Sequence, residues 1–83
     1  MTWFMHLQTE DRHWTSIVKP MAEKYGLHWG LNPDYDRATI TASLVSPAAV
    51  NKPIRIDVDR ANRSEKEIMI DLEKAIAKLM AIK

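Results

Sequence analysis

Apolar and polar side chains alternate most regularly between residues 35 and 46. Ile40, Ala42 and Leu44 fall on one side of this segment, and hydroxyl-bearing or charged residues fall on the other. A period of two is typical of a strand with one buried side and one side facing water. The pattern therefore predicts a strand here, and shorter alternating segments predict further strands over residues 2–7, 27–31 and 54–59.

Residues 9–25 repeat their apolar positions every three or four residues, which is the period of one helical face. Thr9 is a candidate for the residue that caps the start of this helix, and Gly26 suits a left-handed helix end. Pro20 lies inside the segment and lacks the backbone N–H that a helix uses. We expect a kink or a break close to Lys19.

A second helix is predicted from Ser64 to about Ala81. Ser64 and Glu67 have the spacing of a capping box, in which each residue satisfies a free donor at the helix start. Its buried stripe is expected to contain Ile68, Leu72 and Ile76.

The order of these elements is β-α-β-β-β-α, which predicts an α+β fold in one small domain spanning residues 1–83. The connections at residues 32–34 and 47–53 are short enough for hairpins, so the four-stranded sheet should be mostly antiparallel, with both helices packed on one face. The expected core residues are Trp14, Ile17, Val18, Ile40, Leu44, Ile56, Val58, Ile68, Leu72 and Ile76.

Composition narrows the functional classes. The 83 residues contain no cysteine, which removes disulfides and thiolate metal sites. The longest apolar run is only a few residues, too short to span a membrane. The first residues carry no basic segment of the kind with which a signal peptide begins. We therefore expect a cytoplasmic protein without a membrane partner. The formal net charge of +1 lacks the strong basic excess of most dedicated nucleic-acid binders.

Catalytic motifs are weak in this sequence. The three histidines form no i,i+4 pair, and two glycines are too few for a phosphate-binding loop. Two Asp-x-Asp pairs, at residues 34–36 and 57–59, could hold Mg²⁺ only if the fold brought them together, and aspartate at position 34 or 36 is also common in turns. We expect no enzyme activity, no cofactor and no metal. A small metal-dependent hydrolase that uses the Asp-x-Asp pairs is the third hypothesis, after the two binding hypotheses below.

The order α-β-β-β-α, which follows the first predicted strand, is similar to that of double-stranded-RNA-binding domains. Residues 64–67, Ser-Glu-Lys-Glu, also resemble the start of that family's second helix. Glu65 and Met69 stand where the family would need phosphate-binding basic residues, and Asn32-Pro33-Asp34 lacks the family's groove-entering loop. Shared topology alone says little about function. Nucleic-acid binding through Arg37, Arg55, Arg60, Arg63 and Lys66 is the alternative hypothesis.

The leading hypothesis uses the uncovered face of the sheet. Alternation places Arg37, Thr39, Thr41 and Arg55 on that face together with Asp57 and Asp59, and Phe4 at its margin. A surface with both signs of charge suits a protein partner, because complementary charges set the register of the contact. We expect a non-catalytic protein-binding module, an adaptor or a regulator or inhibitor of a larger complex, whose partner is another protein or a second copy. The candidate binding residues are Phe4, Arg37, Thr39, Thr41, Arg55, Arg60 and Arg63.

Overall fold

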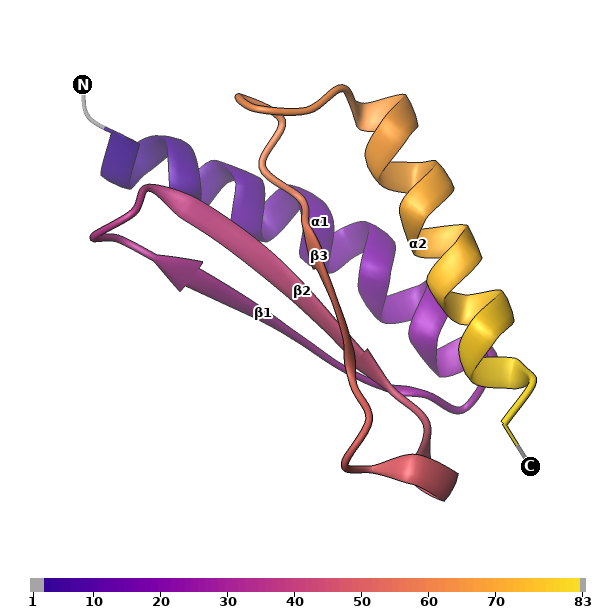
Figure 1. Cartoon of the computed structure of the whole chain (residues 1–83). Helices are drawn as coiled ribbons and strands as arrows, with labels where there is room; N and C mark the ends of the chain where they lie inside the picture. The colour runs from indigo at the N-terminus through magenta and orange to yellow at the C-terminus, as the bar shows by residue number, and fades with distance from the viewer. Residues whose placement is uncertain (1–2, 83) are drawn as a thin grey trace.

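Two helices and a three-stranded antiparallel sheet make up the structure, in the order α-β-β-β-α (Figure 1). The computed structural model describes residues 3–82, with side chains described from residue 5 onward. The elements are α1 (Trp3–Lys24), β1 (His28–Asp34), β2 (Thr39–Val45), the short 3-10 helix η1 (Pro47–Ala49), β3 (Ile54–Asp57) and α2 (Glu65–Met80).

The strand predicted over residues 2–7 is wrong, because Trp3 begins α1 and the sheet has three strands instead of four. Leu7, Glu10, Trp14 and Val18 follow one another at helical spacing and are all buried, so the packed stripe of α1 starts well before residue 9. Thr9 does not cap the helix, since its hydroxyl donates to the Met5 carbonyl at 3.0 Å inside it.

The break predicted near Pro20 does not occur, and α1 continues to Lys24. The carbonyl that loses its helical partner is that of Ser16, four residues earlier. Ser16 and Pro20 both lie on the exposed side of the helix. Water can therefore donate a hydrogen bond to the Ser16 carbonyl, and the helix continues although one internal hydrogen bond is missing.

Of the three helix ends predicted from a specific residue, the one at Thr9 is wrong, whereas those at Gly26 and Ser64 are confirmed. Gly26 has φ = 70°, and the Leu27 N–H donates to the Ala22 carbonyl at 2.9 Å, the bond that closes a Schellman motif. At the start of α2, the Ser64 side chain accepts a hydrogen bond from the Glu67 N–H at 3.2 Å, which is one half of the predicted capping box. Glu67 Oε1 accepts from the Ser64 hydroxyl at 2.9 Å. These local interactions fix where α1 ends and where α2 begins.

The strands are ordered β1-β2-β3, with Trp29 opposite Leu44 and Ile56 opposite Ala42. The turn predicted at residues 32–34 lies instead at residues 35–38, and β1 continues through Pro33. Proline is tolerated there because β1 is an edge strand and one side of it has no neighbour.

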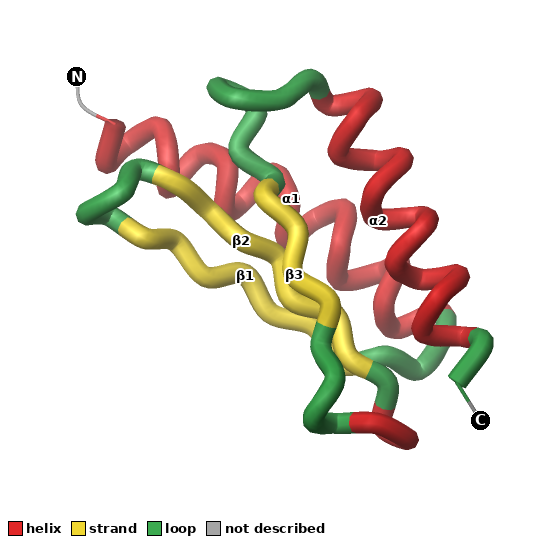
Figure 2. Tube along the Cα trace, viewed as in Figure 1, coloured by secondary structure: helices red, strands yellow, loops and turns green. Residues whose placement is uncertain are grey.

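Both helices cover the same face of the sheet (Figure 2). Helix α1 packs over β1 and β2, and α2 packs over β3 and β2. Nine of the ten predicted core residues are buried, and Ile17 packs at the edge of the core. Among the described residues, neither helix combines the length and the hydropathy needed to cross a bilayer.

Candidate binding surface on the open sheet face

The face of the sheet that points away from the helices is polar. Ile40, Ala42 and Leu44 of β2 are buried toward the helices, so Thr39, Thr41 and Ser43 must point the other way. Residues paired across an antiparallel sheet share a face, and Thr41 lies between two such partners on β1 and β3. The cross-strand partners of Thr39, Thr41 and Ser43 on this face are Gly30, Asn32, Asp34, Arg55 and Asp57.

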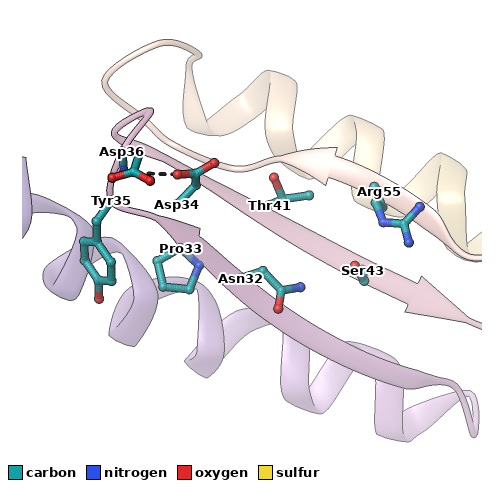
Figure 3. A pocket seen from close by; sticks show the side chains of 8 residues that line it. All are labelled: Asn32, Pro33, Asp34, Tyr35, Asp36, Thr41, Ser43 and Arg55. Atoms are coloured by element: carbon teal, nitrogen blue, oxygen red, sulfur yellow. Dashed lines mark hydrogen bonds between the residues drawn. The ribbon is translucent and has the colours of Figure 1, made fainter.

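A shallow concavity of about 640 Å³ lies over this face (Figure 3). Asp34 and Asp36 lie at one end of it, Arg55 lies at the other end beside its strand partner Ser43, and Thr41 lies between the two ends. The concavity therefore carries opposite charges at its two ends and short hydroxyl side chains along its floor. The remaining lining residues are Asn32, Pro33 and Tyr35.

The acidic end of the concavity is also a structural turn. Asp34 Oδ1 accepts hydrogen bonds from the backbone N–H groups of Asp36 and Arg37, at 3.1 and 3.2 Å. An aspartate that accepts from residues two and three positions ahead holds a tight turn. Arg37 thus lies in the β1–β2 turn and not on the strand face as predicted, with its side chain 83% exposed and its Nε 3.8 Å from Asp34 Oδ2.

Asp57 and Asp59 were predicted to share the open face, and this is wrong for Asp59. The Asp59 side chain is 1% exposed. Its Oδ1 accepts from the Ala61 N–H at 3.0 Å and lies 2.7 Å from His6 Nε2, while its own N–H donates to Asp57 Oδ1 at 3.0 Å. Asp59 therefore anchors the loop after β3 to α1. Of the two aspartates, Asp57 alone lies on the open face.

Arg60 is held by a buried carboxylate on α1. Glu10 is 2% exposed, and Arg60 Nε donates to its two oxygens at 2.9 and 3.0 Å, while Nη2 donates to Oε2 at 2.6 Å. Burial of Glu10 raises its pKa, but the hydrogen bonds and charge of Arg60 outweigh burial and leave the pKa below its usual value. The buried indole N–H of Trp14 also lowers this pKa from nearby, although the pair falls outside hydrogen-bond geometry.

Arg63 is engaged in the same way at the start of α2. Its Nη2 forms an ion pair with Asp71 Oδ2, and its Nη1 donates to the Asp57 carbonyl at 3.0 Å. The hydrogen bond to Asp71 and the nearby carboxylates raise the pKa of Arg63. Arg60 and Arg63 therefore serve the fold of the loop between β3 and α2, and neither lies on the open sheet face.

Two of the three histidines also make contacts within the fold, His6 with Asp59 and His13 with Glu65. His13 Nε2 lies 3.0 Å from Glu65 Oε1, which in turn accepts from Arg60 Nη1 at 3.0 Å. His28 is exposed at the start of β1. Within the described part of the chain, no three His, Asp or Glu side chains are grouped as a metal ion would need.

Of the predicted site residues, the structure brings Thr39, Thr41 and Arg55 together on one face, and it places Arg37, Arg60 and Arg63 elsewhere. The backbone of Phe4 belongs to α1 and not to a strand, and its side chain lies outside the described residues. Asn32 and Asp34 were missed as surface residues. The alternation of β1 continues past residue 31 and would have indicated both residues. The predicted strand stopped at residue 31 because Pro33 indicated a turn.

Comparison with known proteins gives no match: no family model fits the chain, and no curated protein or solved structure is significantly similar to it.

Proposed function

We propose that this chain is a non-catalytic protein-binding module, an adaptor or regulator that contacts its partner through the open face of the sheet. The observation that carries the proposal is the charge pattern of that face. Arg55 lies opposite Asp34 and Asp36 across a floor of small hydroxyl side chains. Such a surface suits a protein with a complementary pattern, in which each charge restricts the register of docking.

Nucleic-acid binding remains the alternative, since the observed order α-β-β-β-α is similar to that of double-stranded-RNA-binding domains. Two observations weigh against it. Arg60 and Arg63, on which it depends, are already bound to Glu10 and Asp71. The open face also keeps the carboxylate of Asp57, which would repel a phosphate backbone.

Site-specific photo-cross-linking tests the proposal. A photoreactive amino acid is placed at Ser43, in the floor of the concavity, and the protein is irradiated in the cells that produce it. The matched control carries the same group at Gln8, which is exposed on α1. We expect a discrete protein adduct, or a dimer of this chain, from position 43 and not from position 8, and its loss when Arg55→Glu is added.

The alternative is tested with the purified protein and generic duplex DNA and RNA. Micromolar binding that weakens steeply with salt, and that is lost in Arg37→Ala with Lys66→Ala, would replace the protein-binding proposal with a nucleic-acid one. These two positions are chosen because both side chains are exposed, so the variants should fold. An absence of any protein adduct at position 43 would also contradict the proposal.

A further inference from the structure

A second surface lies between β3 and α2. A groove of about 600 Å³ runs there, with Ile54 and Ile56 on the strand side and Ala75 and Ala77 on the helix side. Its rim carries Asp71, Lys74 and Lys78. The groove is thus apolar inside and charged at its border. It is lined by β3, which is an edge strand of the sheet and lies beside α2 (Figure 1).

The edge of β3 offers free backbone groups to this groove. The Val58 N–H donates to the Ile40 carbonyl at 3.1 Å, which marks the pair of residues 58 and 40 as a hydrogen-bonded one. Hydrogen-bonded and non-hydrogen-bonded pairs alternate along an antiparallel ladder. Ile56 therefore bonds to β2, whereas the N–H and C=O groups of Arg55 and Asp57 point away from the sheet.

One end of this edge is already closed. The outward carbonyl of Asp57 accepts the hydrogen bond from Arg63, and Arg63 is fixed by its ion pair with Asp71. The N–H and C=O of Arg55 and the N–H of Asp57 remain without a backbone partner in the sheet. An unpaired edge of this kind is a template for an added strand.

The charged residues at the rim determine whether the groove favours an acidic or a basic partner. Asp71 is neutralised by Arg63, and across residues 3–82 no ion pair involves Lys74 or Lys78. Lys74 and Lys78 lie four residues apart on α2, so both ammonium groups border the groove on its helix side. The uncompensated charge around the groove is therefore positive.

We propose that this groove binds an extended, acidic segment of a partner protein, which adds to β3 as a fourth strand. Apolar side chains on one face of the segment enter the groove against Ile54, Ile56 and Ala75, and carboxylates at other positions of that same face meet Lys74 and Lys78. Backbone hydrogen bonds to Arg55 and Asp57 supply affinity, and the apolar sites supply specificity. This contact goes beyond the proposed use of the open face, because it employs the backbone edge of β3 and side chains on the helix-covered side of the sheet.

Fluorescence anisotropy with a labelled peptide tests the inference. The probe is a peptide of about seven residues, the length of an ordinary strand, which carries valines flanked by glutamates on one face and threonines on the other. We expect saturable binding to the full chain, with slowed hydrogen exchange at the Arg55 and Asp57 amides. N-methylation of the alternate amides along one edge of the peptide should abolish binding, and N-methylation along its other edge should not.

Charge reversal provides the matched comparison. Lys74→Glu with Lys78→Glu should weaken binding about ten-fold or more, because like charges then face each other. Lys66→Glu, a single charge reversal on the same helix but outside the groove, should leave the affinity within about two-fold, and each single variant Lys74→Glu and Lys78→Glu is compared with it. Ala77→Trp fills the groove from an exposed position and should also remove binding. Urea midpoints for each variant establish that it is folded.

Three results would overturn the inference. Binding that is equal for both N-methylated peptides would show that no backbone ladder forms. Binding that is unchanged by Lys74→Glu with Lys78→Glu would remove the charge argument. A concentration-dependent dimer that protects the Arg55 amide without any peptide would assign the edge to a second copy of this chain.

Discussion

Replacing Arg60 with methionine should destabilise the protein strongly, although Arg60 is 36% exposed. The change removes the cation and three side-chain hydrogen bonds from Glu10, which is 2% exposed. The buried carboxylate keeps only the backbone N–H of residue 60, at 3.1 Å. Removing one partner of a buried ion pair costs about 3–5 kcal/mol, and the partial exposure of Arg60 places this case near 3 kcal/mol.

Urea unfolding at pH 7 measures this loss, followed by tryptophan fluorescence because Trp14 is fully buried. With an m value of about 1 kcal/mol/M, a loss of about 3 kcal/mol lowers the midpoint by about 3 M. Arg37→Met is the matched control, since Arg37 is 83% exposed and should change the free energy of unfolding by less than about 0.5 kcal/mol.

The pH dependence separates electrostatics from packing. In the wild type the pKa of Glu10 is lowered, so the pair stabilises the protein above the unfolded glutamate pKa of about 4.3, and this stabilisation is lost as the pH falls through the folded pKa. In Arg60→Met the buried carboxylate has no cation, its pKa rises, and protonation relieves the variant at low pH. The difference in the free energy of unfolding between the wild type and Arg60→Met should therefore become smaller as the pH is lowered.

The reasoning is refuted if the two urea midpoints differ equally at pH 7 and near pH 3, or if the loss at pH 7 is below about 1 kcal/mol. The double variant Glu10→Leu with Arg60→Met adds a second check. Removing both charges should recover part of the lost stability, because no uncompensated carboxylate remains in the core.

Three further predictions follow from the fold. Leu72→Ala should lower the free energy of unfolding by about 2–5 kcal/mol, measured by the same urea titration, because Leu72 is 1% exposed in the core; a loss below about 1 kcal/mol would contradict that placement. Pro20→Ala should stabilise the protein by about 1–2 kcal/mol, since it restores a helical N–H at a cost in unfolded-state entropy, and a lower melting temperature would show that the proline ring is needed. Calorimetric titration with Mg²⁺, Mn²⁺ and Zn²⁺ should detect no site tighter than about millimolar, and a micromolar site lost in Asp57→Asn would revive the hydrolase hypothesis.

Some elements of this protein could be predicted because their cause is local. The alternation of Ile40, Ala42 and Leu44 predicts β2 and its buried side, and all three are buried. Ser64 predicts the start of α2 and Gly26 the end of α1, because a side-chain cap and a left-handed residue act within one helical turn. The polar side chains of the open face follow from the same alternation.

The start of α1 was decided by tertiary structure. The six residues predicted as a strand, 2–7, are too few for periodicity to tell a strand from a helix, and the helical stripe that continues from Leu7 is interrupted by a charged side chain, Glu10. Glu10 can be buried only because Arg60, fifty residues later in the chain, reaches its carboxylate.

Tertiary structure also determined which residues are available on the open sheet face and in the groove between β3 and α2. Arg60 and Arg63 looked free in the sequence, yet carboxylates on other elements hold them, and the groove beside β3 exists only where α2 packs along that strand. Periodicity and caps depend on neighbours within a few residues, so the sequence determined the individual elements. Charge pairing and grooves depend on which elements meet, so only the tertiary structure decided which side chains remain available to a partner.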